Sequence, residues 1–190
     1  MNLSHLGDAL DHWKGSVIEM IRDEKLQVIP MLTDPARWTE EDIKTYARLL
    51  HVKPDDILKK GKDDLFSNGT RGSYFCDFGE HDLFLDPDTG VAPKKARKEH
   101  ISFSEVATLL SKSKSRMLLI YEHASRNKDG LREKLKLLRK AEGLEGCHMF
   151  AYDSGAVSMV VISRNLERTD RTRDRFKSWL GPVASARIIE

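Results

Sequence analysis

One short stretch decides the fold: His81-Asp82-Leu83-Phe84-Leu85-Asp86-Pro87-Asp88-Thr89-Gly90. Its apolar run, residues 83–85, is bounded by turn-forming residues and predicts a buried strand of a parallel sheet. Pro87 ends the strand because proline has no N–H to donate to a ladder. Asp86 and Asp88 are therefore expected at the carboxyl end of the strand, which is the edge where open α/β sheets bind ligands.

Helices and strands alternate on both sides of this stretch. The apolar periodicity predicts helices over residues 4–23, 39–50, 104–110, 128–141 and 168–180, and strands over residues 26–32, 117–121, 147–152, 156–163 and 186–189. Ser4, Thr39 and Ser104 are expected to cap three of the helices. The strands at residues 147–152 and 156–163 flank a turn signal and form an expected hairpin. This order predicts an α/β fold: a three-layer sandwich with a mostly parallel sheet, an antiparallel hairpin at one edge and an extra N-terminal helix.

The composition is that of a soluble globular protein. The chain has 190 residues, of which 39% are hydrophobic and 33% are charged, and its formal net charge is +2. Residues 1–190 are expected to form one domain with a full core. The two cysteines, Cys76 and Cys147, lie far apart and indicate reduced thiols. No signal peptide or membrane span is evident, so we expect a cytoplasmic protein without a membrane partner.

Polar residues follow three of the expected strands. They are Thr33-Asp34, Asp86-Pro87-Asp88 and Glu122-His123. In a parallel sheet these groups would share one edge, where they could bind ribose hydroxyls or a base amine. Asp86, Asp88 and Glu122 could instead bind Mg²⁺ or Mn²⁺, and local turn chemistry explains the same residue types. No glycine-rich phosphate loop follows the first strand.

Two further segments could contribute to a site. The first helix carries a polar face with Asp8 and His12, which either is solvated or lines the mouth of a pocket. The loop after the central strand is basic. Its cations, Lys94, Lys95, Arg97 and Lys98, either are solvated or contact phosphate groups of a nucleic acid.

Two motifs resemble one known family. Gly7-Asp8-Ala9-Leu10-Asp11-His12, on the opening helix, is similar to the N-terminal segment of the J-type large-subunit ribosomal RNA adenine methyltransferases. Leu83-Phe84-Leu85-Asp86-Pro87-Asp88 resembles their Asp-Pro-Pro-Tyr strand end, with Asp88 in place of the second proline. The expected strand order is also similar to that of a class I methyltransferase. The motifs cover about a dozen residues, and the topology covers most of the chain.

The resemblance implies an S-adenosylmethionine-dependent enzyme, or a degenerate relative, that acts on or binds nucleic acid. Asp86 and Pro87, with Asp88 beside them, would lie where the family accepts a hydrogen bond from the amine of the target adenine. Asp8 and His12 would lie near the cofactor, with Thr33 and Asp34 at the end of the first strand. Two alternatives stay open. One is a metal-dependent nuclease or phosphohydrolase, and the other is a non-catalytic nucleic-acid-binding module that uses the basic helices.

Overall fold

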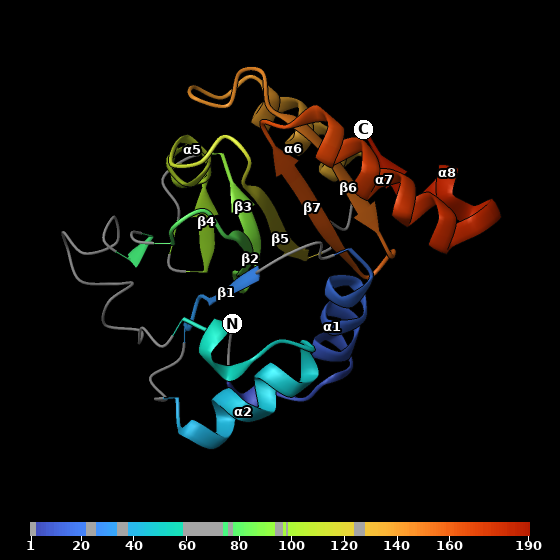
Figure 1. Ribbon diagram of the computed structural model, residues 1–190. Coiled ribbons are helices and arrows are strands. Elements are labelled where there is room, and N and C mark those ends of the chain that lie inside the picture. Colours follow the sequence, from blue (N-terminus) through green and yellow to red (C-terminus); the bar gives the residue numbers. More distant parts are fainter. Residues whose placement is uncertain are drawn as a thin grey trace.

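The computed structural model describes residues 3–21, 26–33, 38–58, 74–75, 78–93, 97, 99–123 and 128–190. These residues form an α/β fold in which a twisted sheet lies between helices (Figure 1). The expected fold class is therefore confirmed. None of the helices in these ranges combines the length and apolar character needed to cross a bilayer.

The main sheet is mixed. Within the described residues its six strands have the order β1-β2-β5-β7-β6-β8. The bounds are β1 (Leu26–Pro30), β2 (Asp82–Asp86), β5 (Met117–His123), β7 (Val157–Ser163), β6 (His148–Asp153) and β8 (Ile188–Ile189). Only β1, β2 and β5 pair in parallel, and the other neighbours pair antiparallel. The expectation of a mostly parallel sheet is wrong because β7 pairs antiparallel with β5, and the hairpin of β6 and β7 together with β8 makes up half of the sheet rather than an edge.

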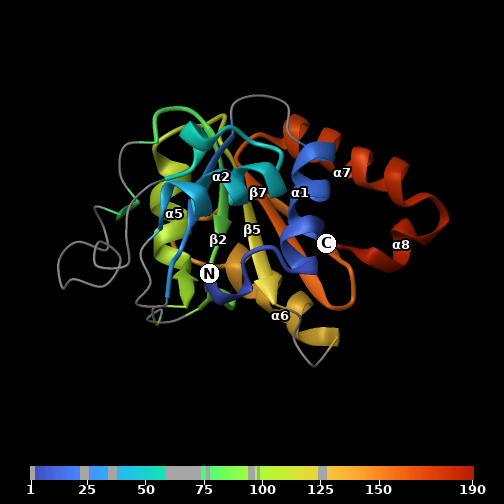
Figure 2. The same ribbon diagram turned by 90° about the horizontal axis from the view of Figure 1, so that it is seen from below.

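Helices cover both faces of this sheet (Figure 2). On one face lie α1 (Ala9–Ile21), α2 (Glu40–Leu49) and α7 (Leu166–Leu180). On the other lie α5 (Phe103–Ser111) and α6 (Lys128–Arg139). Two separate hydrophobic cores result, one on each side of the strands.

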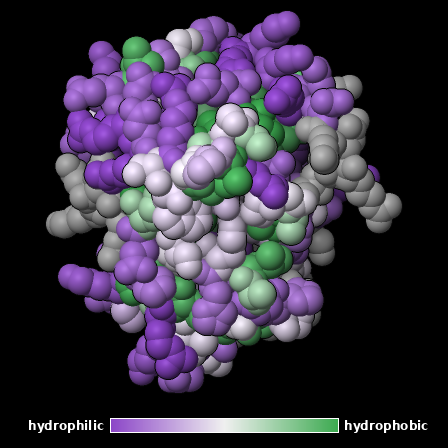
Figure 3. Space-filling model, turned by 90° about the vertical axis from the view of Figure 1, so that its right-hand side faces the viewer, coloured by the Kyte–Doolittle hydropathy of each residue, from purple (hydrophilic) through white to green (hydrophobic). Residues whose placement is uncertain are grey.

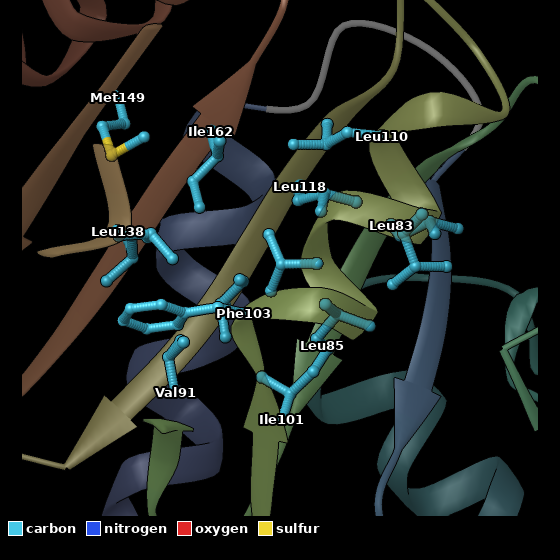
Figure 4. Packing of buried hydrophobic residues seen from close by; sticks show 14 of the residues in the cluster. Leu83, Leu85, Val91, Ile101, Phe103, Leu110, Leu118, Leu138, Met149 and Ile162 are labelled. Carbon is cyan, nitrogen blue, oxygen red and sulfur yellow. The ribbon is translucent and has the colours of Figure 1, made fainter. Parts of the chain in front are cut away.

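Strand β2 supplies both cores because successive side chains of a strand point to opposite faces. Phe84 packs in the core under α1 and α2, whereas Leu83 and Leu85 pack in the core under α5 and α6. Figure 4 shows these two leucines with Leu110 of α5 and Leu138 of α6. Such a strand has no polar face, which is why its sequence is a continuous apolar run.

Helix α1 begins later than the sequence predicts. Residues Leu3–His5 form a short 3-10 turn, η1, and Ser4 does not cap the helix. The Asp8 carboxylate instead accepts hydrogen bonds from the backbone N–H groups of Leu10 (2.8 Å) and Asp11 (3.1 Å). Asp8 is thus the helix cap, and this role fixes its side chain at the start of α1.

The other caps agree in part with the sequence. Thr39 caps α2 through a full capping box with Asp42, as expected. Ser102, not Ser104, caps α5 because its hydroxyl accepts from the N–H of Glu105. Asn165 caps α7, which begins two residues before the predicted start.

Five short elements complete the described part of the fold. β3 (Gly90–Ala92) and β4 (His100–Ser102) form a small parallel pair on either side of the basic loop. A 3-10 turn, η2 (Pro54–Asp56), follows α2. Near the C-terminus lie η3 (Gly181–Val183) and α8 (Ala184–Arg187), and α8 replaces the first half of the expected last strand.

Two arginines bind the amino ends of β2 and β5. The fully buried Arg116 donates to the carbonyl oxygens of His81 (3.0 Å), Leu109 (2.6 Å) and Gly79. Arg168 of α7 forms a two-pronged ion pair with Asp82, whose Oδ1 also accepts from the N–H of Met117 at 2.8 Å. The end of the sheet far from the expected site is therefore held by charge-assisted hydrogen bonds.

The direction of winding reverses between β1 and β2. After α2, Ile57 forms a parallel bridge with Val28, and the N–H of Leu58 donates to the Val28 carbonyl at 2.9 Å. Because Val28 also pairs with Phe84 of β2, Ile57 must lie on the outer side of β1. The chain thus moves outward from β1 to Ile57 and then returns past β1 to form β2.

Candidate functional site

A pocket of about 610 Å³ opens at the carboxyl ends of β1, β2 and β5, beside the start of α1. It lies where the winding reverses, which is the position at which open α/β sheets bind ligands. Its walls come from η1, α1, the strand ends and the segment before β4. The lining residues are His5, Asp8, Leu10, Asp11, Lys14, Thr33, Asp86, Pro87, Asp88, Thr89, Glu99, Tyr121 and His123.

A buried ionic network forms one wall of this pocket. Lys14 Nζ lies 3.0 Å from Asp11 Oδ1 and 3.0 Å from Asp86 Oδ2. The hydroxyl of Tyr46 donates a second hydrogen bond to Asp86 Oδ2. The other carboxylate oxygen of Asp11 accepts from the N–H of Gly7 at 2.9 Å. The network joins α1, α2 and β2, so it fixes the helix layer against the strand end.

Lys14 keeps its charge in this network. Burial alone would lower the pKa of Lys14, but the carboxylates of Asp86 and Asp11 outweigh it and raise that pKa above its usual value. The pKa of Tyr46 is raised by burial and by the neighbouring Asp86, so its hydroxyl stays protonated and donates. Lys14 is therefore a cation with two anionic neighbours, and not a candidate general base near neutral pH.

Tyr121 of β5 lies beneath Lys14. The ammonium is 4.5 Å from the centre of the Tyr121 ring, which is a cation–π distance. Trp13 contacts the same ring edge-on at 6.3 Å between centroids. Desolvation raises the pKa of Tyr121 well above its usual value. The Tyr121 hydroxyl is buried and has no hydrogen-bond partner in the described part of the protein.

The rim beyond Asp86 is polar. The Thr33 hydroxyl donates to Asp88 Oδ2 and so links the ends of β1 and β2. Thr89 also lines the pocket at this rim. Its N–H (3.0 Å) and its hydroxyl (2.9 Å) both donate to the Glu99 carbonyl. The pKa of His123 lies below its usual value because the ring is partly desolvated and the Lys14 ammonium is near. His123 is thus expected to be mostly neutral at pH 7.

Glu122 lies on the opposite face of the sheet. Its neighbours along β5, Leu119 and Tyr121, belong to the core under α1, whereas Ile120 belongs to the core under α6. Alternation therefore directs Glu122 toward α6, where its carboxylate accepts from Lys134 and, at 2.8 Å, from the N–H of Val91. Burial raises the pKa of Glu122 despite these partners.

The structure brings together six of the residues singled out in the sequence. The residues that line the pocket are Asp8, Thr33, Asp86, Pro87, Asp88 and His123. His12 is exposed on α1 outside the lining, and Arg97 is also exposed and outside it. Asp34, Lys94, Lys95 and Lys98 lie outside the described residues.

The carboxylates proposed for a divalent metal do not meet. Asp86 and Glu122 share an edge of the sheet but point to different faces, and each has a lysine partner of its own. Among the side chains that the structure describes, no group of three or more His, Cys, Asp or Glu residues is arranged to hold a metal ion.

The outer faces of the basic helices carry their own counter-charges. Arg171 pairs with Glu167 at 2.8 Å and Arg173 with Asp170 at 2.7 Å, all within α7. Hydrophilic side chains prevail on the side of the molecule that carries α7 and α8, with hydrophobic patches between them (Figure 3). The positive charge of this helix is thus partly neutralised where it faces solvent.

Sequence reasoning missed four residues of the site: Asp11, Lys14, Tyr46 and Tyr121. A usable signal existed for one of them. Lys14 falls inside the apolar stripe formed by Leu10, Val17 and Ile21, and a lysine at a core-facing helix position needs a buried partner. The identity of that partner depends on the fold and cannot be read from spacing along the chain.

Comparison with models of known protein families gives no match, and comparison with curated proteins gives none either. The pocket and its lining residues are therefore the basis on which a function can be proposed.

Proposed function

We propose that the pocket binds S-adenosylmethionine and that the protein is a class I methyltransferase-like protein that acts on or binds nucleic acid. The observation that carries the proposal is the position of the pocket at the winding reversal between β1 and β2. A crevice of this kind takes nucleotide-like ligands in doubly wound folds. The resemblance of the two sequence motifs to adenine methyltransferases supports the same choice.

The charge of the pocket favours this ligand over a dinucleotide. Among the described lining residues, one carries an ammonium, Lys14, and five carry a carboxylate: Asp8, Asp11, Asp86, Asp88 and Glu99. Such a wall repels a pyrophosphate and attracts a cation. S-adenosylmethionine carries a sulfonium, an ammonium and a single carboxylate, so it is a net cation, and it has no phosphate that would need a glycine-rich loop. The pocket volume of about 610 Å³ falls within the usual range for small-molecule sites.

The residues of the pocket fit distinct tasks. Asp8, at the start of α1, and Asp88, after the end of β2, are suited to hold ribose hydroxyls or the ligand ammonium. When bound, S-adenosylmethionine would supply an activated methyl group. Asp86 positions Lys14 and Tyr46 rather than meeting the substrate itself, because both already donate to its Oδ2. We assign the contact with a substrate amine to Pro87 and Asp88, which line the pocket beyond it.

The nucleic-acid part of the proposal rests on the basic loop. Thr89 and Glu99, on either side of it, are joined by hydrogen bonds and both line the pocket. The segment that carries Lys94, Lys95, Arg97 and Lys98 therefore starts and ends at the rim. Of these cations the structure describes Arg97, which is exposed, and an exposed cation on this segment suits the phosphates that flank a target base.

Isothermal titration of the folded protein with S-adenosylmethionine and S-adenosylhomocysteine tests the ligand. We expect saturable binding of both, with Asp88→Asn weakening it and Glu133→Gln, on the exposed side of α6, leaving it unchanged. Absence of heat with both ligands, from protein with a native circular dichroism spectrum, would contradict the proposal.

A filter assay tests the nucleic-acid partner. Transfer of a labelled methyl group to total RNA or DNA would support catalysis. Binding without transfer, with an affinity that falls steeply with salt, would support the non-catalytic form. Arg97→Ala is expected to reduce that salt dependence.

A further inference from the structure

His123 is the last residue of β5 and lies at the rim of the pocket. Its side chain is exposed, whereas the preceding six residues of the strand are buried. Because side chains alternate along a strand, His123 lies on the sheet face of Tyr121 and opposite to Glu122. The His123 and Tyr121 rings contact edge to face, at 5.2 Å between centroids and 81°. A buried aromatic ring thus supports the imidazole, which remains open to the pocket.

The strand register brings His123 next to the residues assigned to the substrate amine. Leu85 of β2 pairs with Ile120 of β5, and Asp88 and His123 each follow three residues later. Pro87, Asp88 and His123 accordingly line the same pocket. An amine held at the ends of β2 and β5 would therefore lie beside the imidazole.

The imidazole is suited to accept a proton near neutral pH. Partial desolvation and the nearby Lys14 ammonium hold the pKa of His123 below its usual value. The carboxylates of Asp88 and Asp86 act against this shift and would stabilise the imidazolium once it forms. No hydrogen bond to the described part of the chain occupies the ring nitrogens.

The two carboxylates nearby are weaker proton acceptors. Asp86 already accepts hydrogen bonds from Lys14 and Tyr46. Despite partial desolvation, the hydrogen bond from Thr33 helps to hold the pKa of Asp88 below its usual value. A general base works best when its pKa is close to the working pH, and among these groups the imidazole comes nearest.

We propose that His123 is the general base of the site and accepts the proton that the substrate amine loses. This inference rests on the proposed function and adds a catalytic residue to it. When the amine attacks the methyl group, its nitrogen forms the new bond to carbon, and the sulfur keeps the electron pair of the bond that breaks. The nitrogen then holds one proton in excess, and that proton moves to a ring nitrogen of His123.

Two matched histidine variants test this role. His148 begins β6 at the opposite end of the sheet, where it pairs with Ser163. We expect His123→Gln to slow methyl transfer to RNA or DNA about 100-fold and His148→Gln to leave the rate unchanged. Both variants should bind S-adenosylhomocysteine as tightly as the parent in calorimetry, because the imidazole meets the amine. Added imidazole should partly restore transfer by His123→Ala.

The protonation of His123 gives a readout that needs no turnover. The imidazole C2–H signal that His123→Gln lacks in its NMR spectrum should titrate, in the parent, below the usual histidine pKa of about 6.5. Methyl transfer by the parent should decline as the pH falls through that same value, because an imidazolium cannot accept a proton. Transfer by His123→Gln should lack this decline.

Each outcome bears on the inference. Equal transfer rates of His123→Gln and the parent would overturn the role of His123 and leave the proposed function standing. A His123 signal that titrates above pH 7 would do the same, as would a loss of S-adenosylhomocysteine affinity that matches the loss of rate. Binding of this ligand by the parent without any methyl transfer would overturn the inference and leave the non-catalytic form of the proposed function. Failure of the parent to bind S-adenosylmethionine and S-adenosylhomocysteine would overturn both proposals.

Discussion

The ammonium of Lys14 lies 3.0 Å from the carboxylate of Asp86, a residue 72 positions further along the chain, and both side chains are buried. This ion pair connects the first helix to the end of the central strand. It also sets the floor of the pocket, because Lys14 in turn covers the ring of Tyr121. Several measurable consequences follow from such buried and closely packed contacts.

Removing one member of the ion pair should destabilise the protein strongly. Asp86→Ala leaves Lys14 with Asp11 alone and deprives Tyr46 of its acceptor. We expect the free energy of unfolding to fall by about 3–5 kcal/mol in urea titrations. The matched control is Glu133→Ala, which breaks an exposed ion pair with Lys136 and should cost less than about 1 kcal/mol. Similar losses in the two variants would argue against a buried ion pair.

The closest approach of α1 to α2 depends on a glycine. A Cβ at Gly15 would lie 1.9 Å from the backbone carbonyl oxygen of Leu49, which cannot move aside as a side chain could. Gly15→Ala should therefore lower the free energy of unfolding by about 2–3 kcal/mol, despite the better helix propensity of alanine. Ser16→Ala, at the next and exposed position, should change it by less than about 0.5 kcal/mol. Thermal unfolding of the two variants under the same conditions measures this difference in stability.

Glu122 should make stability depend on pH in an unusual direction. Because burial raises its pKa, the folded protein holds this proton more tightly than the unfolded chain does. Stability contributed by this group is thus lost as pH rises from the usual glutamate pKa through the raised one. The glutamine side chain of Glu122→Gln does not titrate, so the variant lacks this pH-dependent loss of stability. The unfolding free energy of the variant minus that of the parent should therefore increase as the pH rises above the usual glutamate pKa of about 4. A difference that stays flat or decreases would contradict a raised pKa.

Two substitutions at Asp8 should separate its structural role from its role in the pocket. Asp8→Ala removes the cap of α1 and should cost about 1 kcal/mol of stability. Asp8→Asn preserves the capping oxygen, so stability should change by only a few tenths of a kcal/mol. Because Asp8→Asn removes a negative charge from the pocket, it should still weaken binding of S-adenosylmethionine in calorimetry. Equal affinity of Asp8→Asn and the parent would assign Asp8 to the helix cap alone.

Much of the fold could be predicted from local patterns. The continuous apolar run at residues 83–85 identifies the central buried strand, and the turn at residues 153–155 identifies the hairpin. Shared strand direction also predicted that Thr33, Asp86 and Asp88 would meet at one edge, and they line one pocket. The strand and the hairpin depend on residues that are close together in sequence. The shared edge follows from the rule that parallel strands end on the same side of a sheet.

The rest depends on relations that the sequence does not encode locally. Whether Glu122 shares a face with Asp86 is decided by the register between β2 and β5. The pattern of residues within each strand does not determine the order of the strands in the sheet, so it does not predict that β7 lies between β5 and β6. The partners of Lys14 come from a nearby residue of α1 and from a distant strand, so only the fold reveals the network.

The arginine contacts at the opposite end of the sheet have an evolutionary consequence. Arg116 and Arg168 hold β2 and β5 through the carbonyls of His81 and Ser115 and the carboxylate of Asp82, all remote from the pocket. The scaffold is thereby anchored at the pole away from the pocket, so the rim side chains outside the buried Lys14–Asp86 network are released from that duty. Descendants of such a chain can exchange rim side chains, and with them ligands, without losing the architecture that presents them.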